Sequence, residues 1–465
     1  MNRHIPLFLV MVMVATVSRG QATAPGSQQT VPPAPTTQNA PSSPPAAPPP
    51  HTAATIPPGA QALSLQEAQA LALKNNPLIS VARLSALAQH QVARQVRSAL
   101  WPTATGYLTA VDSHDNTRIT AGVLNNPSVF DRAGGGTLIS QLITDFGRTT
   151  NLASSASLQA RAEDQNALAT REQILLAVHQ AFYSTLQAQA VLKVAEETVN
   201  ARQTVTDQVE ALFRSKLKSE LDASFARVNL AQAKLLLLDA QNNANAALAN
   251  LSAVLGFPTL QNFYLVETTE PMAAPPANLD QLVSEAFAQR PEILSLGFQL
   301  QAAQRFRVAE RDLMLPSIRA LGAVGGTPVR DDRILSNWYG AAGVNLELPI
   351  FNGFLYSARA KEADLRAQAV RDRLRDLQNR VARDVRTAWL NSNSAYDRMN
   401  VTRQLLDQAN LALNLAQTRY NLGLGSIVEL SQAQLQQTQA VIADTEAGYD
   451  YRLALATLRF QTTGL

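Results

Sequence analysis

The stretch that decides the fold runs from Arg371 to Tyr420 and reads RDRLRDLQNRVARDVRTAWLNSNSAYDRMNVTRQLLDQANLALNLAQTRY. It lies inside a run of 69 residues, from Phe354 to Leu422, that contains neither Gly nor Pro. At a rise of about 1.5 Å per residue, one helix through this run would be roughly 100 Å long, far longer than an average globular helix. A second run, residues 148–255, is free of Gly and Pro over 108 residues. Helical rods of this length need other helices alongside them.

Small or apolar residues recur through this stretch at a regular spacing. Thirteen steps cover 46 residues, which is about 3.5 residues per step, the period of a left-handed coiled coil. Many of these positions hold Ala, Ser or Thr where a two-stranded zipper would hold Leu or Ile, so helix backbones can approach closely, as in the wall of a multi-helix tube. The positions are Leu374, Leu377, Val381, Val385, Ala388, Ser392, Ala395, Met399, Thr402, Leu406, Ala409, Leu413, Ala416 and Tyr420.

The chain carries its landmarks twice, which indicates a tandem duplication. Two prolines stand 25 residues apart in each copy, and a short Phe- and Gly-containing motif precedes each long helix. Four further residues recur 207 positions later. The matched landmarks are Asn76-Pro77 with Arg290-Pro291, Pro102 with Pro316, Asp145-Phe146-Gly147 with Phe351-Asn352-Gly353, and Phe213, Ser219, Asp222 and Gln232 with Tyr420, Ser426, Glu429 and Gln439.

We therefore predict two repeats, residues 61–257 and 278–465, joined by a linker at 258–277. Each repeat is expected to contain a helix of about 35 residues that ends at a proline, a strand-like stretch, a helix of about 65 residues, a tight turn and a returning helix of about 37. This pattern predicts a mainly α chain with a small β part, built from long coiled-coil helical hairpins.

Four segments between the helices have strand composition: residues 102–112, 136–146, 316–324 and 338–350. Val344, Leu346 and Leu348 alternate with Asn345 and Glu347, which suits a strand with lipid on one face and water on the other. Loops are expected at 114–135 and 325–337, and the triplet Gly134-Gly135-Gly136 is expected to form a turn before a strand. Trp101 and Trp338 stand at strand ends, where interfacial aromatic belts occur; core packing is an alternative for Trp101.

Four strands cannot close a membrane barrel, and an open sheet edge is not tolerated in hydrocarbon. Barrels of about 8 strands have filled interiors, so a wide pore suggests three chains that contribute 12 strands. The same trimer would place 12 helical rods side by side as a tube beneath the barrel. We predict a trimeric 12-stranded β-barrel joined to an α-helical barrel.

The N-terminal residues predict secretion. Residues 1–24 combine basic residues near the start, an apolar run from Ile5 to Val17 and small residues up to Ala24, which is typical of a signal peptide. Residues 25–60 are predicted to be a disordered Pro-rich linker, because 12 of the 24 prolines lie at positions 25–58. The chain contains no Cys, which excludes disulfides, thiolate metal sites and a lipid-modified N-terminal Cys.

Catalytic and nucleic-acid-binding functions find no support in the sequence. The five histidines, at positions 4, 51, 90, 114 and 179, do not pair at ligand spacing, and the hydrolase, metalloprotease and phosphate-loop motifs are absent. The formal net charge is only +3, and the basic stretch from Arg359 to Arg386 is interleaved with acids, as on a solvated helix face. We predict no enzymatic activity, no metal, no cofactor and no nucleic-acid partner.

Residues 64–464 resemble the TolC-like outer membrane efflux proteins (outer membrane factors) through the duplication, the Asn-Pro and Leu-Pro helix ends and the segment YNLGLGSIVEL at 420–430. That segment is similar to the family's Y-x-x-G-x-x-S-x-x-[DE]-L turn. The resemblance implies a homotrimer whose barrel lies in the lipid of the outer membrane of a Gram-negative type envelope and whose helical barrel crosses the periplasm. It also implies the function of an exit duct for a tripartite efflux or type I secretion system, with a periplasmic adaptor and an inner-membrane pump of RND, ABC or MFS type as partners. A periplasmic coiled-coil scaffold or adaptor that forms no channel is the alternative.

In that family the turn between long and returning helix is the periplasmic tip, where the pore narrows and the adaptor docks. The residues that the resemblance assigns to this tip are Tyr420, Gly423, Leu424, Gly425, Ser426, Glu429 and Gln432 in the second copy and Phe213, Leu217, Ser219 and Asp222 in the first. Gly425 and Gln432 stand where some members carry a basic residue and a second acid, and Lys216 replaces the glycine in the first copy, so that turn matches the pattern less well.

The two acids at the turns have two interpretations. A ring of acids at a constriction favours cations and is hard to ionise fully, which would make Glu429 a gate residue. Alternatively, Glu429 and Asp222 are N-terminal helix residues that interact favourably with the helix dipole.

Overall fold

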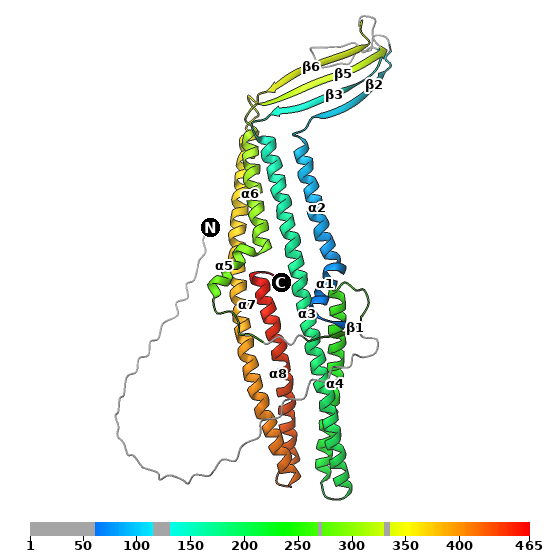
Figure 1. The fold of residues 1–465 in the computed structure, drawn as a ribbon, viewed down its shortest axis with the longest axis vertical. Coiled ribbons are helices and arrows are strands. Elements are labelled where there is room, and N and C mark those ends of the chain that lie inside the picture. The colour runs from blue at the N-terminus through cyan, green and yellow to red at the C-terminus, as the bar shows by residue number, and fades with distance from the viewer. Residues whose placement is uncertain (1–60, 115–130, 268–271, 330–334) are drawn as a thin grey trace, which may run out of the picture. The chain divides into compact units, whose positions relative to one another are not determined.

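The structure, a computed structural model, describes residues 61–114, 131–267, 272–329 and 335–465, which belong to one compact unit. The predicted signal peptide and the whole of the predicted Pro-rich linker lie outside the described residues. Figure 1 shows long helices that lead to a four-stranded sheet. The elements are β1 Gln61–Leu63, α1 Leu65–Asn75, α2 Pro77–Ser98, β2 Thr103–Val111, β3 Arg132–Thr144, α3 Arg148–Arg214, α4 Glu220–Val254, β4 Phe263–Leu265, α5 Leu279–Gln289, α6 Pro291–Asp312, β5 Ser317–Val329, β6 Trp338–Glu347, α7 Leu355–Asn421 and α8 Ile427–Thr462.

The element lengths repeat, which confirms the tandem duplication. Helices α1 and α5 have 11 residues each, α2 and α6 have 22 each, and α3 and α7 have 67 each. The returning helices α4 and α8 have 35 and 36 residues. The prediction of a mainly α chain made of long helical hairpins is thus confirmed.

The first helix of each repeat is broken, where a single helix of about 35 residues was predicted. Pro77 and Pro291 begin α2 and α6, and the residues before them, Asn76 and Arg290, are extended. A proline ring disfavours helical backbone in the residue that precedes it, so the first helix must stop there. The side-chain oxygen of Asn76 accepts a hydrogen bond from Leu78 N at 3.0 Å and caps the new helix.

The predicted coiled-coil seam of α7 faces its neighbours. Of its fourteen positions, seven are buried and seven are half-buried. Val381 and Val385 form a cluster with Ala286 of α5 and Ile293 of α6, while the lower part of α7 lies along α8. In the first repeat α3 contacts α4, and it also contacts α2, α6 and α8, so it lies at the centre of the helical layer.

The four long strands form one antiparallel sheet in the order β2-β3-β5-β6. Strands β2 and β6 are therefore edges, and every residue of β6 is exposed. The triplet Gly134-Gly135-Gly136 lies within β3, so the predicted turn was wrong. Tyr339 of β6 explains part of this, because a Cβ on Gly136 or on Gly325 of β5 would collide with its ring or hydroxyl. The glycines leave room for an aromatic side chain that lies across the sheet.

A second, smaller sheet was not predicted. Strands β1 and β4 pair in parallel, with Gln61 opposite Phe263 and Leu63 opposite Leu265. Their side chains join α1 and α3 in a cluster that contains the fully buried Phe182. None of the described helices is both long enough and apolar enough to cross a bilayer.

His179 of α3 lies beside this cluster and is 8% exposed. Its Nε2 lies 2.7 Å from Nε2 of Gln69 on α1. Burial, with positively charged Arg459 nearby, lowers the pKa of His179 from 6.5 to about 4. The imidazole is therefore neutral in the folded chain near pH 7.

This pKa predicts acid sensitivity. Between pH 6.5 and about 4 the unfolded chain binds a proton at position 179 and the folded chain does not. The free energy of unfolding therefore falls by about 3 kcal/mol as the pH drops through this window. His179→Gln is expected to flatten this part of the pH profile of thermal unfolding. Identical slopes for wild type and His179→Gln would contradict the assignment.

Candidate functional site at the two helical turns

The turn of the second repeat closes α7 onto α8 through a glycine. Gly423 has φ 74°, the left-handed conformation that glycine adopts most easily. Leu424 N donates to Arg419 O at 2.8 Å and Gly423 N donates to Tyr420 O at 3.1 Å, the pair of bonds that defines a Schellman motif. The hydroxyl of Ser426 then accepts from Glu429 N at 3.1 Å and caps α8.

The turn of the first repeat has the same geometry, although it was expected to match less well. Leu217 N donates to Leu212 O and Lys216 N donates to Phe213 O, both at 2.9 Å. Lys216 has φ 62° at the position that corresponds to Gly423. The cap is more complete here, because Ser219 and Asp222 bond each other's backbone in a capping box. The fold therefore imposes this conformation on a lysine.

The structure brings the two turns together. A single buried cluster, here called the tip cluster, contains residues from all four helices of the two hairpins. Five of its eight members come from the second hairpin, and Tyr420 is the largest of them. Its members are Val209, Ala223, Ala226, Ala416, Tyr420, Ile427, Leu430 and Ala433.

Tyr420 also contacts the first turn directly. Nζ of Lys218 lies 3.8 Å from the centre of the Tyr420 ring, within the range of a cation–π interaction. Burial and the nearby charge of Asp222 raise the pKa of Tyr420. Its hydroxyl oxygen is buried and has no hydrogen-bond partner among the described residues. Of the predicted site residues, Tyr420 and Asp222 are thus neighbours across the two hairpins.

Polar contacts above the tip cluster hold the hairpins together, and the sequence did not predict them. Nδ2 of Asn229 donates to the hydroxyl of Ser431 at 2.7 Å. Arg202 of α3 donates to Gln434 O at 2.9 Å and to Oγ1 of Thr438 at 3.2 Å. Burial lowers the pKa of Arg202. No pattern in the sequence indicates which helix these polar side chains face.

Glu429 has a local partner. Nε of Arg419 lies 3.1 Å from a carboxylate oxygen of Glu429, and the Glu429 side chain remains 43% exposed. Gly425 lies between them, since a Cβ there would be 3.2 Å from both side chains. The carboxylate is thus ion-paired within its own turn, and its exposed part faces solvent in the single chain.

The other predicted site residues lie at the surface of the turns. Leu217 and Leu424 occupy equivalent positions and are 71% and 70% exposed. Phe213 and Gln432 are also exposed. Within the described ranges, no group of three or more acidic or histidine side chains is arranged to hold a metal ion. The turns therefore present two exposed apolar side chains and an ion-paired acid.

The chain is similar to known proteins over most of its length. The model of the family described as outer membrane efflux protein matches residues 69–257 and 282–464. The outer membrane efflux protein BepC of Brucella suis biovar 1 (strain 1330) is 24% identical over 86% of this chain and 86% of its own length. TolC of Escherichia coli (strain K12) is 22% identical over 63% of each chain. A solved structure of CusC superposes with a TM-score of 0.75 at 20% identity over 86% of this chain and 92% of that one.

The left-handed lysine predicts a stabilising substitution. A non-glycine residue in this conformation costs about 1 kcal/mol, so Lys216→Gly is expected to raise the free energy of unfolding by up to that amount. Gly423→Ala at the equivalent position is expected to lower it by about 1 kcal/mol. Thermal unfolding of the purified variants measures both, and a loss of stability in Lys216→Gly would show that the lysine side chain contributes more than its backbone strain costs.

Proposed function

Because the chain belongs to the outer membrane efflux protein family, we propose that it forms the exit duct of a tripartite export system as a homotrimer. Family membership confirms the predicted outer membrane location and the predicted transport role in place of an enzymatic one. It also disfavours a scaffold or adaptor that forms no channel. The trimeric assembly and the partner proteins are proposed in the following paragraphs.

The observation that carries the proposal is a sheet with two unpaired edges. Among the residues that the structure describes, strands β2 and β6 each have one side without a partner strand. A sheet of four strands in hydrocarbon would leave these backbone groups without hydrogen bonds, at a cost of several kcal/mol each. Pairing β6 of one copy with β2 of the next removes every edge. Three copies then give 12 strands, enough for a barrel wider than the filled barrels of about 8 strands.

The helices fit the same symmetry. In one chain α2, α3, α6 and α7 lead to the strands, and α4 and α8 return beside the lower halves of α3 and α7. Three copies would place the four rods of each chain in one closed wall. The small residues of the seam allow the close backbone approach that such a wall needs. A channel through the barrel and the helical tube follows.

The proposed partners are a periplasmic adaptor and an inner-membrane pump. The relatives' names support an export role with different cargoes: CusC is a cation efflux system protein and OpmQ a pyoverdine export protein. We infer that the tip carries the adaptor contact, because Leu217 and Leu424 are exposed apolar side chains at equivalent positions of the two turns. Three copies would present six such exposed leucine side chains.

The duct proposal is tested on the purified full chain. Outer membrane fractions should contain heat-resistant trimers, and these trimers should conduct ions in planar lipid bilayers. A soluble periplasmic monomer without conductance would overturn the proposal.

The charge at the tip is tested in the same bilayers. If the mouth of the pore lies at the tips, Arg419 offsets the negative charge of Glu429 there. Glu429→Gln is therefore expected to lower the cation preference by about two- to threefold and to weaken block by divalent cations, while Arg419→Gln is expected to raise the cation preference. Reversal potentials in a salt gradient measure both changes.

A matched pair on the same helix serves as the control. Glu362 and Arg366 also form an exposed ion pair, but they lie near the start of α7. Glu362→Gln and Arg366→Gln are expected to leave the reversal potential at the wild-type value. Equal effects of the two pairs, or no effect of Glu429→Gln, would exclude Glu429 as a gate residue.

The adaptor contact is tested by photo-crosslinking in living cells. A photoreactive residue in place of Leu217 or Leu424 is expected to form an adduct with a periplasmic adaptor, identified by mass spectrometry. The same residue in place of Leu405, an equally apolar but mid-helix position that is 52% exposed, is expected to yield at least about tenfold less of that adduct. Adducts only between copies of this chain would contradict the docking role of the turns.

A further inference from the structure

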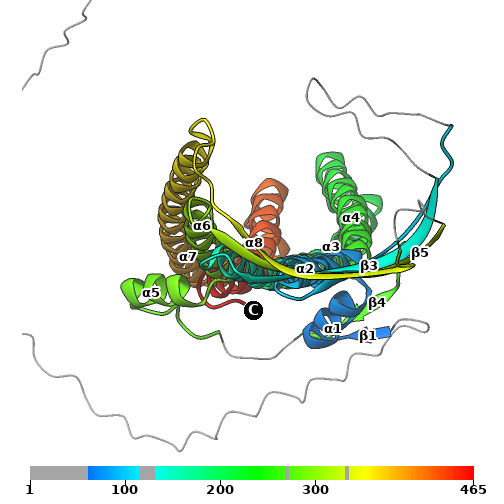
Figure 2. The same ribbon diagram turned by 90° about the horizontal axis from the view of Figure 1, so that it is seen from above.

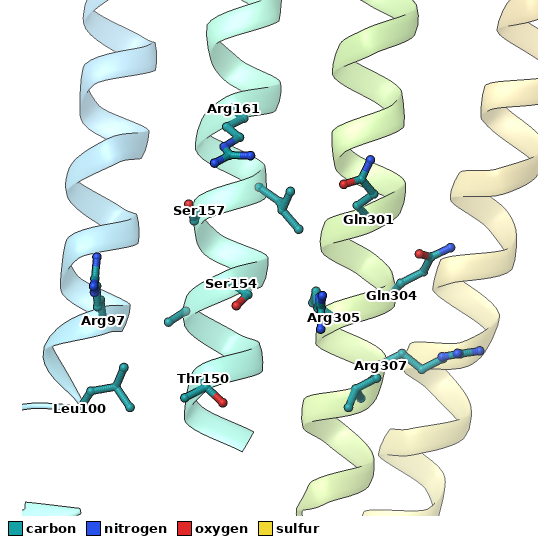
Figure 3. Close-up of a pocket in the computed structure, with 13 residues that line it drawn as sticks. Arg97, Leu100, Thr150, Ser154, Ser157, Arg161, Gln301, Gln304, Arg305 and Arg307 are labelled. Atoms are coloured by element: carbon teal, nitrogen blue, oxygen red, sulfur yellow. The ribbon is translucent and has the colours of Figure 1, made fainter. Parts of the chain in front are cut away.

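A polar cavity of about 860 Å³ lies between α2, α3 and α6, near the ends of these helices that adjoin the sheet. Four of the thirteen residues that line it are arginines, and none is an acid. The lining also offers hydroxyl and amide groups from Thr150, Ser154, Ser157, Gln301 and Gln304. Figure 3 shows that the arginines come from three different helices. The cavity is therefore electropositive and rich in hydrogen-bond donors.

Among the described residues, three of the four arginines have no acidic partner. Arg307 is bound to Asp364 of α7 at 3.2 Å, and Figure 3 shows it directed toward that helix. Arg97, Arg161 and Arg305 are exposed and form no ion pair or side-chain hydrogen bond with the described residues. Each comes from a different helix, so the fold gathers three uncompensated charges at one place. Such a group attracts an anion of matching size.

The cavity opens on the side of α3 that also carries α1. Phe182 and Val178 of α3 belong to the cluster with α1, β1 and β4. In a coiled coil with a period of 3.5 residues, positions 21 residues apart share a face. Arg161 and Ser157 lie 21 residues before Phe182 and Val178 and so share their face. Figure 2 shows α1 and β1 on the convex side of the sheet. In a closed barrel that side faces outward, so the cavity is not part of the cargo path.

The position of the cavity relative to the sheet matches the polar surface of a bilayer. This step rests on the proposed function, in which the sheet spans the membrane. Trp101, Phe351 and Phe354 are exposed aromatic side chains where strands meet helices, as at a membrane–water interface. Arg97 lies in the last turn of α2, four residues before Trp101, and one such turn measures roughly 5 Å, about the depth of the headgroup layer. The cavity thus begins at headgroup level.

We propose that Arg97, Arg161 and Arg305 form a binding site for the headgroup of an anionic phospholipid in the leaflet that faces the helices. Guanidinium groups bind phosphate oxygens with paired, charge-assisted hydrogen bonds, and basic pockets between helices at a membrane surface bind acidic headgroups. The hydroxyls of Ser154 and Ser157, which also line the cavity, offer further donors. Leu100, which also lines the cavity, lies on the side of the sheet, where the acyl chains of the lipid would run.

A neighbouring copy would leave this site open. Pairing between copies takes place at β2 and β6, the edges of the sheet. The cavity is centred on α3, which lies between α2 and α6 of the same chain. All three arginines therefore come from one chain, and a trimer would hold three separate sites.

The experiment is a lipid titration of the purified trimer followed by native mass spectrometry. Wild type is expected to bind phosphatidylglycerol, and the triple variant Arg97→Gln, Arg161→Gln, Arg305→Gln is expected to bind it at least about tenfold more weakly. The control variant Arg371→Gln, Arg373→Gln, Arg375→Gln removes the same charge from three exposed arginines of α7 that form no ion pair with the described residues. It is expected to bind the lipid like wild type. The trimer mass in the same spectra shows that each variant has assembled.

The alternative outcomes are separable. Equal phosphatidylglycerol binding by wild type and the cavity variant, or equal losses in both triple variants, would overturn the site. Wild-type binding of phosphatidylcholine as tight as that of phosphatidylglycerol would overturn its selectivity for an anionic headgroup. Displacement of the lipid by inorganic phosphate at equal concentration would mark a general anion site and overturn the lipid assignment. Conductance of each preparation is recorded in parallel, so that loss of the duct function is distinguished from loss of lipid binding.

Discussion

Close contact between helix backbones is the interaction on which the rest of this structure depends. Buried positions along the long helices are mainly Ala, Ser and Thr, so the rods approach near enough for a hydroxyl on one helix to bond a carbonyl on the next. Ser155 donates to Ala302 O at 2.8 Å, while Oγ1 of Thr185 lies 3.2 Å from Ala247 O and Oγ1 of Thr206 lies 3.1 Å from Ala226 O. Each small contact contributes little, and stability comes from their repetition over a rod roughly 100 Å long.

The sequence predicted those parts of the fold whose signals are local and long. The 67-residue helices follow from runs without Gly or Pro, and the strands β2, β3, β5 and β6 follow from their composition and alternation. The turn after Tyr420 was predicted from the resemblance of the segment YNLGLGSIVEL at 420–430 to the turn of the family. The duplication added further support, since each feature of one copy could be checked against the other.

The missed features depend on partners that are distant in the sequence. The pairing of β1 with β4 joins three-residue strands about 200 positions apart, too short to leave a pattern. The glycines of β3 were predicted to form a turn, because no neighbouring residue in the sequence indicates that the side chain of Tyr339 lies across them. Lys216 adopts a glycine-like conformation because the hairpin around it leaves no other, and the contacts of Arg202 and Lys218 exist only because two turns 207 residues apart meet. The ion pair between Glu429 and Arg419 was also not predicted, because it depends on the exact conformation of the turn between α7 and α8.

The equal length of α3 and α7 has a consequence for how such a chain can evolve. Both helices start at the sheet and both end at the tip cluster, so both must span the same distance between the sheet and the tip cluster. Deleting one heptad from α7 alone would move Tyr420 roughly 10 Å away from Lys218. The seam residues of α7 would still face the same neighbours, but the two turns would no longer lie at the same level. A change in reach must therefore be made in both repeats, and in the returning helices too. In this fold, the lengths of corresponding helices in the two repeats therefore have to change together.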